Sequence, residues 1–198
     1  ETFARTIDAV RQLRPDRIAL YAYAHLPQRF NPQRRIHPAE LPLPSQRVAM
    51  LGAALEGLGA GGYVYIGMDH FALPDDALAI AKRQGRLHRN FQGYSTQPDC
   101  DLIGLGVSSI GRLGATYGQN AKTLEEYHDA MRQGQFATVR GLALTRDDLV
   151  RRAVIMALMC QGQVAFESIE LSHLIDFAAY FRAELEALAP LADLGFVD

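Results

Sequence analysis

The sequence predicts an α/β fold whose C-terminal part is mainly helical. Short apolar runs typical of strands alternate with helical apolar periodicity up to about residue 120, and helical spacing dominates after it. The glycine-rich stretch 111–120 (GRLGATYGQN) separates the region of alternating strands and helices from the mainly helical region. We therefore expect one portion over residues 1–120 and a mainly helical portion over residues 121–198.

The first elements are a helix, a strand and a long loop. Apolar residues recur at helical spacing and Pro15 ends the pattern; they are Phe3, Ile7, Val10 and Leu13. The run Ile18 to Ala24 (IALYAYA) is typical of a strand covered on both faces, which predicts parallel pairing. Repeated prolines over residues 26–44 exclude a regular element there.

The next elements continue the alternation. Ser45 is predicted to cap a helix that glycines end near residue 60, and Tyr63 to Ile66 is predicted to be a strand. Asp75 and Asp76 precede a predicted helix over residues 77–84. The irregular stretch 87–99 then leads to an apolar run, 102–110, in which Gly104 and Gly106 indicate a bulge or close backbone approach.

Helices are expected to fill the rest of the chain. Thr123 and Glu126 form a capping box for a helix that Gly134 closes. Asp147 and Asp148 precede a predicted helix over 149–160. A last amphipathic helix is predicted to end before Pro190, with one apolar stripe of Leu174, Phe177, Phe181, Leu185 and Leu188.

Composition excludes several classes of partner. Twenty Lys plus Arg against 22 Asp plus Glu give a net charge of −2, so neither nucleic acid nor an anionic membrane is expected to bind. Apolar runs are too short to span a bilayer and no signal segment opens the chain, which favours a cytoplasmic protein. Cys100 and Cys160 stand sixty residues apart, so both are expected to be buried rather than to ligate a metal.

Several polar groups are candidates for chemistry, each with a structural alternative. Asp69 and His70 follow a predicted strand end, where active-site groups gather, although such a pair often only orients a loop. Loop arginines could bind a carboxylate-rich ligand or simply be solvated; they are Arg34, Arg35 and Arg89. Phe91, Gln92 and Tyr94 could meet a planar ligand or pack a loop, and the histidines form no zinc motif.

Three stretches resemble the oxygen-independent coproporphyrinogen III oxidases, a radical S-adenosylmethionine family. They are YAHLPQRFNPQRRI at 23–36, GMDHFALPDDALAIAKRQGRLHRNFQGYSTQ at 67–97 and DLIGLGVSSIG at 101–111. The resemblance implies an interior or C-terminal fragment, namely the C-terminal part of an incomplete TIM-type barrel followed by a mainly helical region. It also implies an oxidoreductase of porphyrin and haem biosynthesis that converts coproporphyrinogen III to protoporphyrinogen IX.

In that family a CxxxCxxC motif holds a [4Fe-4S] cluster, and two S-adenosylmethionine molecules bind. A 5'-deoxyadenosyl radical takes a hydrogen atom from a propionate β-carbon; loss of carbon dioxide and one electron then leaves a vinyl group. This chain has only two cysteines, so the resemblance implies that cluster ligands and catalytic residues lie elsewhere and that the fragment alone is inactive. Matching positions imply that Ala24, Ile110, Phe91 and Gln92 bind the second S-adenosylmethionine.

Two alternatives remain open. A related haem chaperone shares the barrel and cluster but resembles HNxxYW where this chain has HRNFQGY, which favours the oxidase. A non-catalytic interaction module, with the helical part as its docking surface, is the other alternative.

Overall fold

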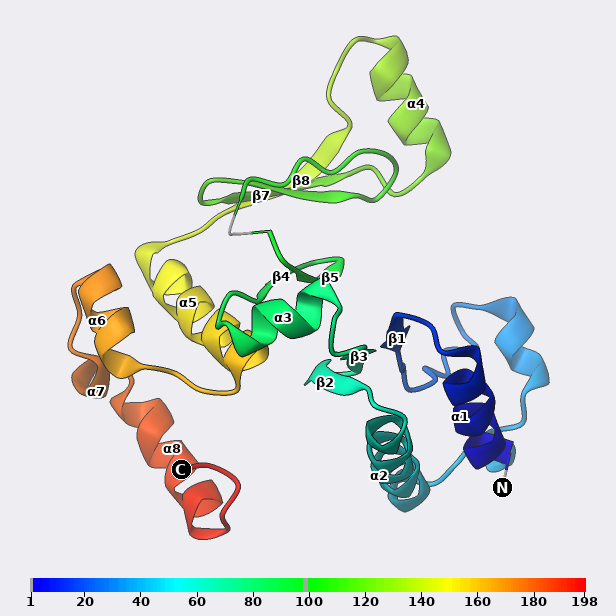
Figure 1. The fold of residues 1–198 in the computed structure, drawn as a ribbon. Coiled ribbons are helices and arrows are strands. Elements are labelled where there is room, and N and C mark those ends of the chain that lie inside the picture. Colours follow the sequence, from blue (N-terminus) through cyan, green and yellow to red (C-terminus); the bar gives the residue numbers. More distant parts are fainter. Residues whose placement is uncertain (1, 98–99) are drawn as a thin grey trace. The chain divides into compact units, whose positions relative to one another are not determined.

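The computed structural model describes residues 2–97 and 100–198, which divide into two compact units (Figure 1). Unit 1 comprises residues 1–87 and 94–96, and unit 2 comprises residues 88–93 and 97–198. Pro98 and Asp99, at the end of the predicted irregular stretch, lie outside the described residues. Residue 120, where the sequence predicts a domain boundary, is the last residue of a strand, and that boundary stays a prediction.

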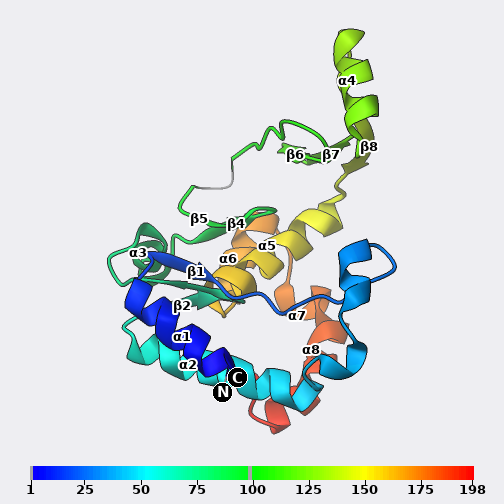
Figure 2. The same ribbon diagram turned by 90° about the vertical axis from the view of Figure 1, so that its right-hand side faces the viewer.

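Unit 1 packs two helices beside a small sheet. Helix α1 (Thr2–Leu13) runs beside α2 (Pro44–Ala60), as Figure 2 shows. The sheet has the order β1 (Arg17–Ala19), β3 (His70–Ala72), β2 (Val64–Gly67). Apolar side chains from both helices and the sheet form one core of Ile7, Ala54, Leu58, Tyr63 and Phe71. Two 3-10 turns, η1 (Asn31–Arg35) and η2 (Pro38–Glu40), shape the proline-rich loop, and α3 (Ala77–Arg83) completes the unit.

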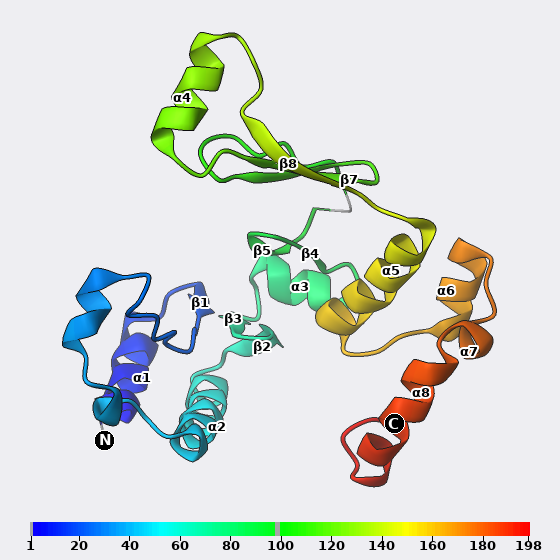
Figure 3. The same cartoon turned by 180° about the vertical axis from the view of Figure 1, so that it is seen from behind.

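Unit 2 consists of a sheet and a group of helices. The sheet has the order β6 (Ile110–Leu113), β7 (Thr116–Asn120), β8 (Thr138–Ala143), and α4 (Leu124–Arg132) connects β7 to β8 (Figure 3). Helices α5 (Arg146–Gln161), α6 (Phe166–His173), α7 (Phe177–Tyr180) and α8 (Arg182–Asp193) follow. Their shared core is Val150, Ile169, Phe177 and Phe181. The hairpin of β4 (His88–Asn90) and β5 (Gly93–Ser95) lies where the two units meet in sequence.

The strands differ most from the sequence prediction. The predicted strand 18–24 is paired only as β1, which ends at Ala19, and Tyr21 and Tyr23 are exposed. Pairings among β1, β2 and β3, and among β6, β7 and β8, are antiparallel rather than parallel. Tight turns join β2 to β3 and β6 to β7, which requires the antiparallel direction in those two pairs. The run 102–110 is no continuous strand, since Leu102 makes only an isolated bridge to Arg112.

The glycine prediction in that run is confirmed at Gly104. A Cβ atom there would lie 2.9 Å from the carbonyl carbon of Ile110, so the two backbone segments approach too closely for any side chain. Gly111 faces the same segment, because its Cβ would lie 2.8 Å from the Leu102 carbonyl oxygen.

Helix ends were predicted better, with some corrections. Asp76 and Thr123 cap α3 and α4 as expected, but α2 begins at Pro44, so Ser45 is not its cap. The predicted last helix is divided into α7 and α8, which meet at Phe181, and Leu174 is not part of either because it adopts a left-handed conformation that ends α6. Pro190 lies inside α8 rather than beyond its end. Cys160 is buried as predicted, whereas Cys100 is exposed.

Candidate functional site

Phe91 and Gln92 form the turn between β4 and β5. The side-chain oxygen of Asn90 accepts a hydrogen bond of 2.8 Å from the Gln92 backbone N–H, which fixes this turn. The Phe91 ring is 58% exposed and meets the Tyr117 ring edge to face, with centroids 5.4 Å apart. Phe91 is therefore held at one edge while most of its surface stays available to a ligand.

Ile110 lies on the sheet face against which Phe91 packs. Ile110 is paired with Gln119 and Arg112 with Tyr117, so these four side chains project from one face of β6 and β7. Tyr117 carries the contact to Phe91, and its hydroxyl accepts a hydrogen bond of 3.3 Å from Arg152 Nε. The structure thus brings Phe91 and Ile110 to one face of the sheet, through a tyrosine that sequence reasoning missed because only the strand register reveals it.

Ala24 belongs to unit 1 and does not end a strand. It is exposed and lies five residues beyond β1, which corrects the predicted position at a strand end. Its carbonyl accepts a hydrogen bond of 3.1 Å from Gln33 Nε2, and Gln33 Oε1 accepts one of 2.5 Å from the Leu26 N–H. The segment is thus tied to η1, and the prediction that Ala24 shares a ligand with the other three residues stays a prediction.

Asp69 and His70 form an ion pair on the turn between β2 and β3. His70 Nδ1 lies 2.7 Å from Asp69 Oδ1. Two tyrosine rings stand nearly perpendicular to the imidazole, that of Tyr21 at 6.2 Å and that of Tyr94 at 5.4 Å. The arrangement leaves one ring nitrogen facing the carboxylate, as in sites that orient a histidine for binding or proton transfer.

Lys82, on α3, braces the end of β2 close to this turn. Its Nζ donates to the carbonyls of Tyr65 and Ile66, each at 2.8 Å, and lies over the Tyr65 ring. Burial lowers the pKa of Lys82, and burial together with the charge of Asp69 raises the pKa of Tyr65. These contacts hold the strand end rather than bind a ligand.

Arg34 has a structural role in its loop. Its Nε donates to the Pro27 carbonyl at 3.0 Å, within the proline-rich segment. Arg34 thus has a partner within its own loop, a role that differs from both predicted alternatives, the carboxylate-rich ligand and the solvated side chain.

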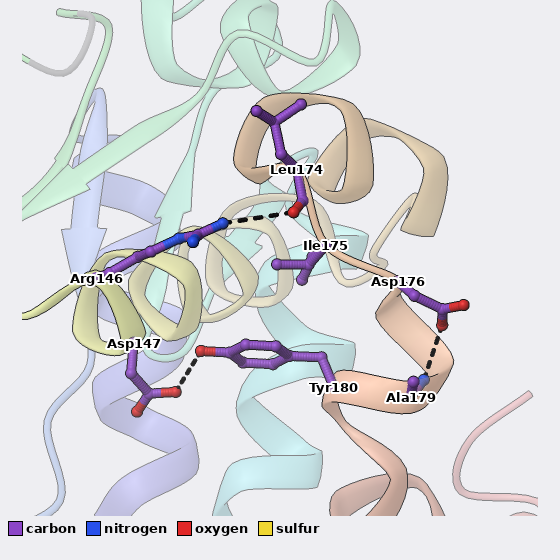
Figure 4. Close-up of a pocket in the computed structure, with 7 residues that line it drawn as sticks. All are labelled: Arg146, Asp147, Leu174, Ile175, Asp176, Ala179 and Tyr180. Atoms are coloured by element: carbon purple, nitrogen blue, oxygen red, sulfur yellow. Dashed lines mark hydrogen bonds between the residues drawn. The ribbon is translucent and has the colours of Figure 1, made fainter.

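A pocket of about 480 Å³ lies among the helices of unit 2 (Figure 4). It is lined by Arg146, Asp147, Leu174, Ile175, Asp176, Ala179 and Tyr180. Its polar groups already have partners: Arg146 donates to the His173 carbonyl at 2.9 Å, and Tyr180 donates to Asp147 at 2.6 Å. The pocket therefore offers an apolar floor with few unused hydrogen-bonding groups.

Charge pairing around this pocket shifts several pKa values. Hydrogen bonds from Tyr180 and Arg151 hold the pKa of Asp147 below its usual range, and the same contact with Asp147 raises the pKa of Tyr180. Arg151 also pairs with Glu184 at 2.6 Å, which lowers the pKa of that carboxyl. The network joins α5 to α7 and α8.

The chain contains fewer cysteines than the three thiolates of a CxxxCxxC cluster motif. Such a cluster requires several thiolates, and the sequence contains two cysteines, Cys100 and Cys160. Within residues 2–97 and 100–198, no three His, Cys, Asp or Glu side chains gather closely enough to hold a metal ion. None of the helices in the same ranges combines the length and apolar character needed to span a bilayer.

Comparison with known proteins gives consistent results. Residues 144–198 match the HemN C-terminal domain. Oxygen-independent coproporphyrinogen III oxidase of Pseudomonas aeruginosa is 54% identical over 185 residues, 93% of this chain and 40% of that protein. The enzyme of the same name from Escherichia coli is 49% identical over 198 residues, all of this chain and 43% of that protein.

A solved structure agrees over the whole chain. It superposes with a TM-score of 0.95 at 49% identity, covering 99% of this chain and 45% of the solved one, and is described as "Coproporphyrinogen III oxidase (HemN) from Escherichia coli is a Radical SAM enzyme". The chain is similar over its length to part of the oxygen-independent coproporphyrinogen III oxidases. This confirms the resemblance predicted from the three motifs, and the α/β fold class with it. The chain spans 40% and 43% of the length of the two oxidases above.

Proposed function

We propose that this chain serves in an oxygen-independent coproporphyrinogen III oxidase, as part of a longer polypeptide that forms protoporphyrinogen IX. The observation that supports this most strongly is the agreement in sequence and fold with the E. coli radical S-adenosylmethionine enzyme along 99% of the chain. The reaction takes a hydrogen atom from the β-carbon of each of two substrate propionates, and loss of carbon dioxide and one electron then leaves a vinyl group. Since only two cysteines are present, the proposal assigns the cluster ligands to residues outside this chain.

Within this function, we propose that Phe91, Gln92 and Ile110 bind one of two S-adenosylmethionine molecules, with Ala24 as a further contact. Bound S-adenosylmethionine supplies the radical that starts hydrogen abstraction, and the protein positions it. The exposed Phe91 ring offers a stacking surface, the Gln92 amide offers both a donor and an acceptor, and Ile110 offers an apolar contact. Phe91 packs against Tyr117, which projects from the same sheet face as Ile110.

The function is tested with a chimera: the E. coli enzyme in which this chain replaces its matching segment. After anaerobic cluster reconstitution, the chimera should convert coproporphyrinogen III to protoporphyrinogen IX in the presence of S-adenosylmethionine. A chimera that is folded and holds its full iron content yet forms no vinyl product would contradict the proposed function.

The ligand site is tested in the same chimera by Ile110→Asp. The buried part of an apolar ligand contact would then face a carboxylate, so we expect fewer S-adenosylmethionine molecules bound per enzyme and slower decarboxylation, with iron content unchanged. Leu113→Asp is the matched control, because Leu113 is exposed on the same strand but projects from the opposite face. Equal effects of the two substitutions would argue against the site.

A further inference from the structure

The turn that carries Asp69 and His70 is strained and firmly held. Gly67 pairs with His70, so Met68 and Asp69 are the two turn residues. Met68 has a φ of 50°, in the left-handed region that a residue with a Cβ adopts only at a cost in free energy. Two hydrogen bonds hold the turn, from the Tyr65 hydroxyl to the Met68 carbonyl at 2.7 Å and from the Leu20 N–H to the Asp69 carbonyl at 2.8 Å. Backbone strain of this kind concentrates at functional sites.

The turn holds the imidazole of His70 with its Nδ1 atom toward Asp69. Nδ1 is cut off from solvent and lies 2.7 Å from Asp69 Oδ1, within ion-pair distance but without the geometry of a hydrogen bond, whereas 19% of the His70 side chain stays exposed. The carboxylate of Asp69 therefore occupies the Nδ1 side of the ring. The nitrogen that can face a ligand is therefore Nε2.

Two aromatic rings from segments far apart in sequence pack beside this imidazole. The Tyr21 and Tyr94 rings stand at 89° and 80° to it, and Tyr21 is 70% exposed. Perpendicular packing of this kind is a favourable arrangement of aromatic rings. The two tyrosine rings thus limit how the imidazole can turn.

We propose that the Asp69–His70 pair binds a carboxylate of a ligand through His70 Nε2. The proposal rests on the proposed function, in which both ligands carry carboxylates: the propionates of coproporphyrinogen III and the amino-acid group of S-adenosylmethionine. In the proposed complex the ligand carboxylate accepts a hydrogen bond from the Nε2 N–H, while Nδ1 stays beside Asp69. Asp69 and the tyrosines position the ring, and only His70 touches the ligand.

The test compares two substitutions of His70 in the chimera. Gln can place an N–H donor near the position of Nε2, whereas Asn can place one only near Nδ1. We expect His70→Asn to raise one KM on the order of 10- to 100-fold, the value of one lost hydrogen bond to a charged group, with His70→Gln restoring part of the loss. His37→Asn is the control, because His37 is exposed in the same unit and caps η2.

Two measurements identify the carboxylate and exclude a purely structural role. A raised KM for coproporphyrinogen III alone assigns the propionate, and a raised KM for S-adenosylmethionine alone assigns its amino-acid carboxylate. Equilibrium binding of the tetramethyl ester of coproporphyrinogen III and of decarboxylated S-adenosylmethionine should be insensitive to His70→Asn, because both lack the carboxylate. Unchanged KM values for both substrates, or equal weakening of the carboxylate-free analogues, would overturn the proposal.

Failure of the proposed function gives a different result. An unmutated chimera that forms no product refutes the function. Equilibrium binding of coproporphyrinogen III and S-adenosylmethionine, compared between the unmutated chimera and His70→Asn, then still tests the His70 site.

A second variant is used if His70→Asn disturbs the fold. If His70→Asn lowers the iron content or the helical circular dichroism of the chimera, Asp69→Asn replaces it. Asn is close to Asp in shape but lacks the negative charge beside Nδ1, so we expect a raised KM for the same substrate by a smaller factor. Unchanged binding in that variant would count against the pair.

Discussion

Asp147 shows how single contacts set the response of unit 2 to pH. Its carboxylate accepts hydrogen bonds from the Tyr180 hydroxyl at 2.6 Å and from Arg151 Nε at 2.8 Å. Both donors favour the ionised form, which is why the pKa of Asp147 is lowered. The same contact favours the neutral phenol, so the pKa of Tyr180 is raised.

These shifts predict how Tyr180→Phe changes stability. A lowered carboxyl pKa stabilises the fold above about pH 4, the unfolded value, and that stabilisation is lost as pH falls through the folded value. A raised phenol pKa stabilises the fold below about pH 10 and is lost as pH rises through the folded value. Tyr180→Phe should therefore flatten the dependence of the urea midpoint on pH at both ends. Tyr127→Phe, whose hydroxyl has no hydrogen bond among the described residues, should leave the profile unchanged.

At this scale, sequence reasoning identified residue types better than their neighbours. The motif matches singled out Phe91 and Ile110, but their common support, Tyr117, follows from the pairing of Arg112 with Tyr117. A register of this kind depends on contacts between strands, and a shift of one residue would have turned Ile110 to the other face. The Asp69–His70 pair was visible in the sequence, whereas the positive φ of Met68 was not.

Among the elements, α5 has the most complete N-terminal cap. Thr145 Oγ1 accepts a hydrogen bond of 3.2 Å from the Asp148 N–H, and Asp148 Oδ2 accepts one of 2.8 Å from the Thr145 N–H. This reciprocal pair satisfies donors that a helix start would otherwise leave unpaired.

Loss of this cap should have a measurable cost. Thr145→Ala is expected to lower the free energy of unfolding by about 1 kcal/mol, because the Asp148 N–H loses its side-chain acceptor. Urea unfolding followed by circular dichroism measures this free energy. Thr145→Ser keeps the hydroxyl, so its free energy of unfolding should lie within about 0.5 kcal/mol of the value for the unmutated chain. An alanine variant as stable as the parent would show that solvent replaces the cap.

The capped helices were predictable because capping is local in sequence. Thr123 and Glu126 predict the start of α4. Asp76 caps α3, because its carboxylate accepts a hydrogen bond from the Leu78 N–H. Strand β8 was missed because all six of its residues are exposed, so no alternation of apolar and polar residues reveals it. The sequence predicts a helix that ends before Pro190, but α8 contains this proline, since a missing hydrogen bond near an exposed helix end is tolerated.

At the scale of the whole molecule, each unit has a core of its own. Leu58 is fully buried in the core of unit 1, and Val150 is fully buried in that of unit 2. Compact units with separate cores often open as separate cooperative units. The sequence does not predict this division. It indicates a change from alternating strands and helices to mainly helices near residue 120, but it does not indicate which segments contact one another.

Hydrogen exchange should make the two cores visible. Leu58→Ala leaves a cavity that costs about 2–5 kcal/mol and should reduce amide protection in α1, α2 and the sheet of β1, β3 and β2. Val150→Ala is the matched substitution and should act on α5, α6 and α7 instead. Exchange measured by mass spectrometry on this chain separates the segments, and a uniform loss of protection in either variant would show that the cores unfold together.

Strand β8 has one further consequence, for how the chain behaves at high concentration. It is an outer strand of its sheet, its side chains are exposed on both faces, and Arg140 is its one charged residue. An outer strand offers unpaired backbone N–H and C=O groups to any other strand that meets it, and a charge is the usual protection against such pairing. Edge-to-edge pairing of β8 between two copies would bring two Arg140 side chains to one paired edge, so this arginine has the charge and the position of a gatekeeper residue.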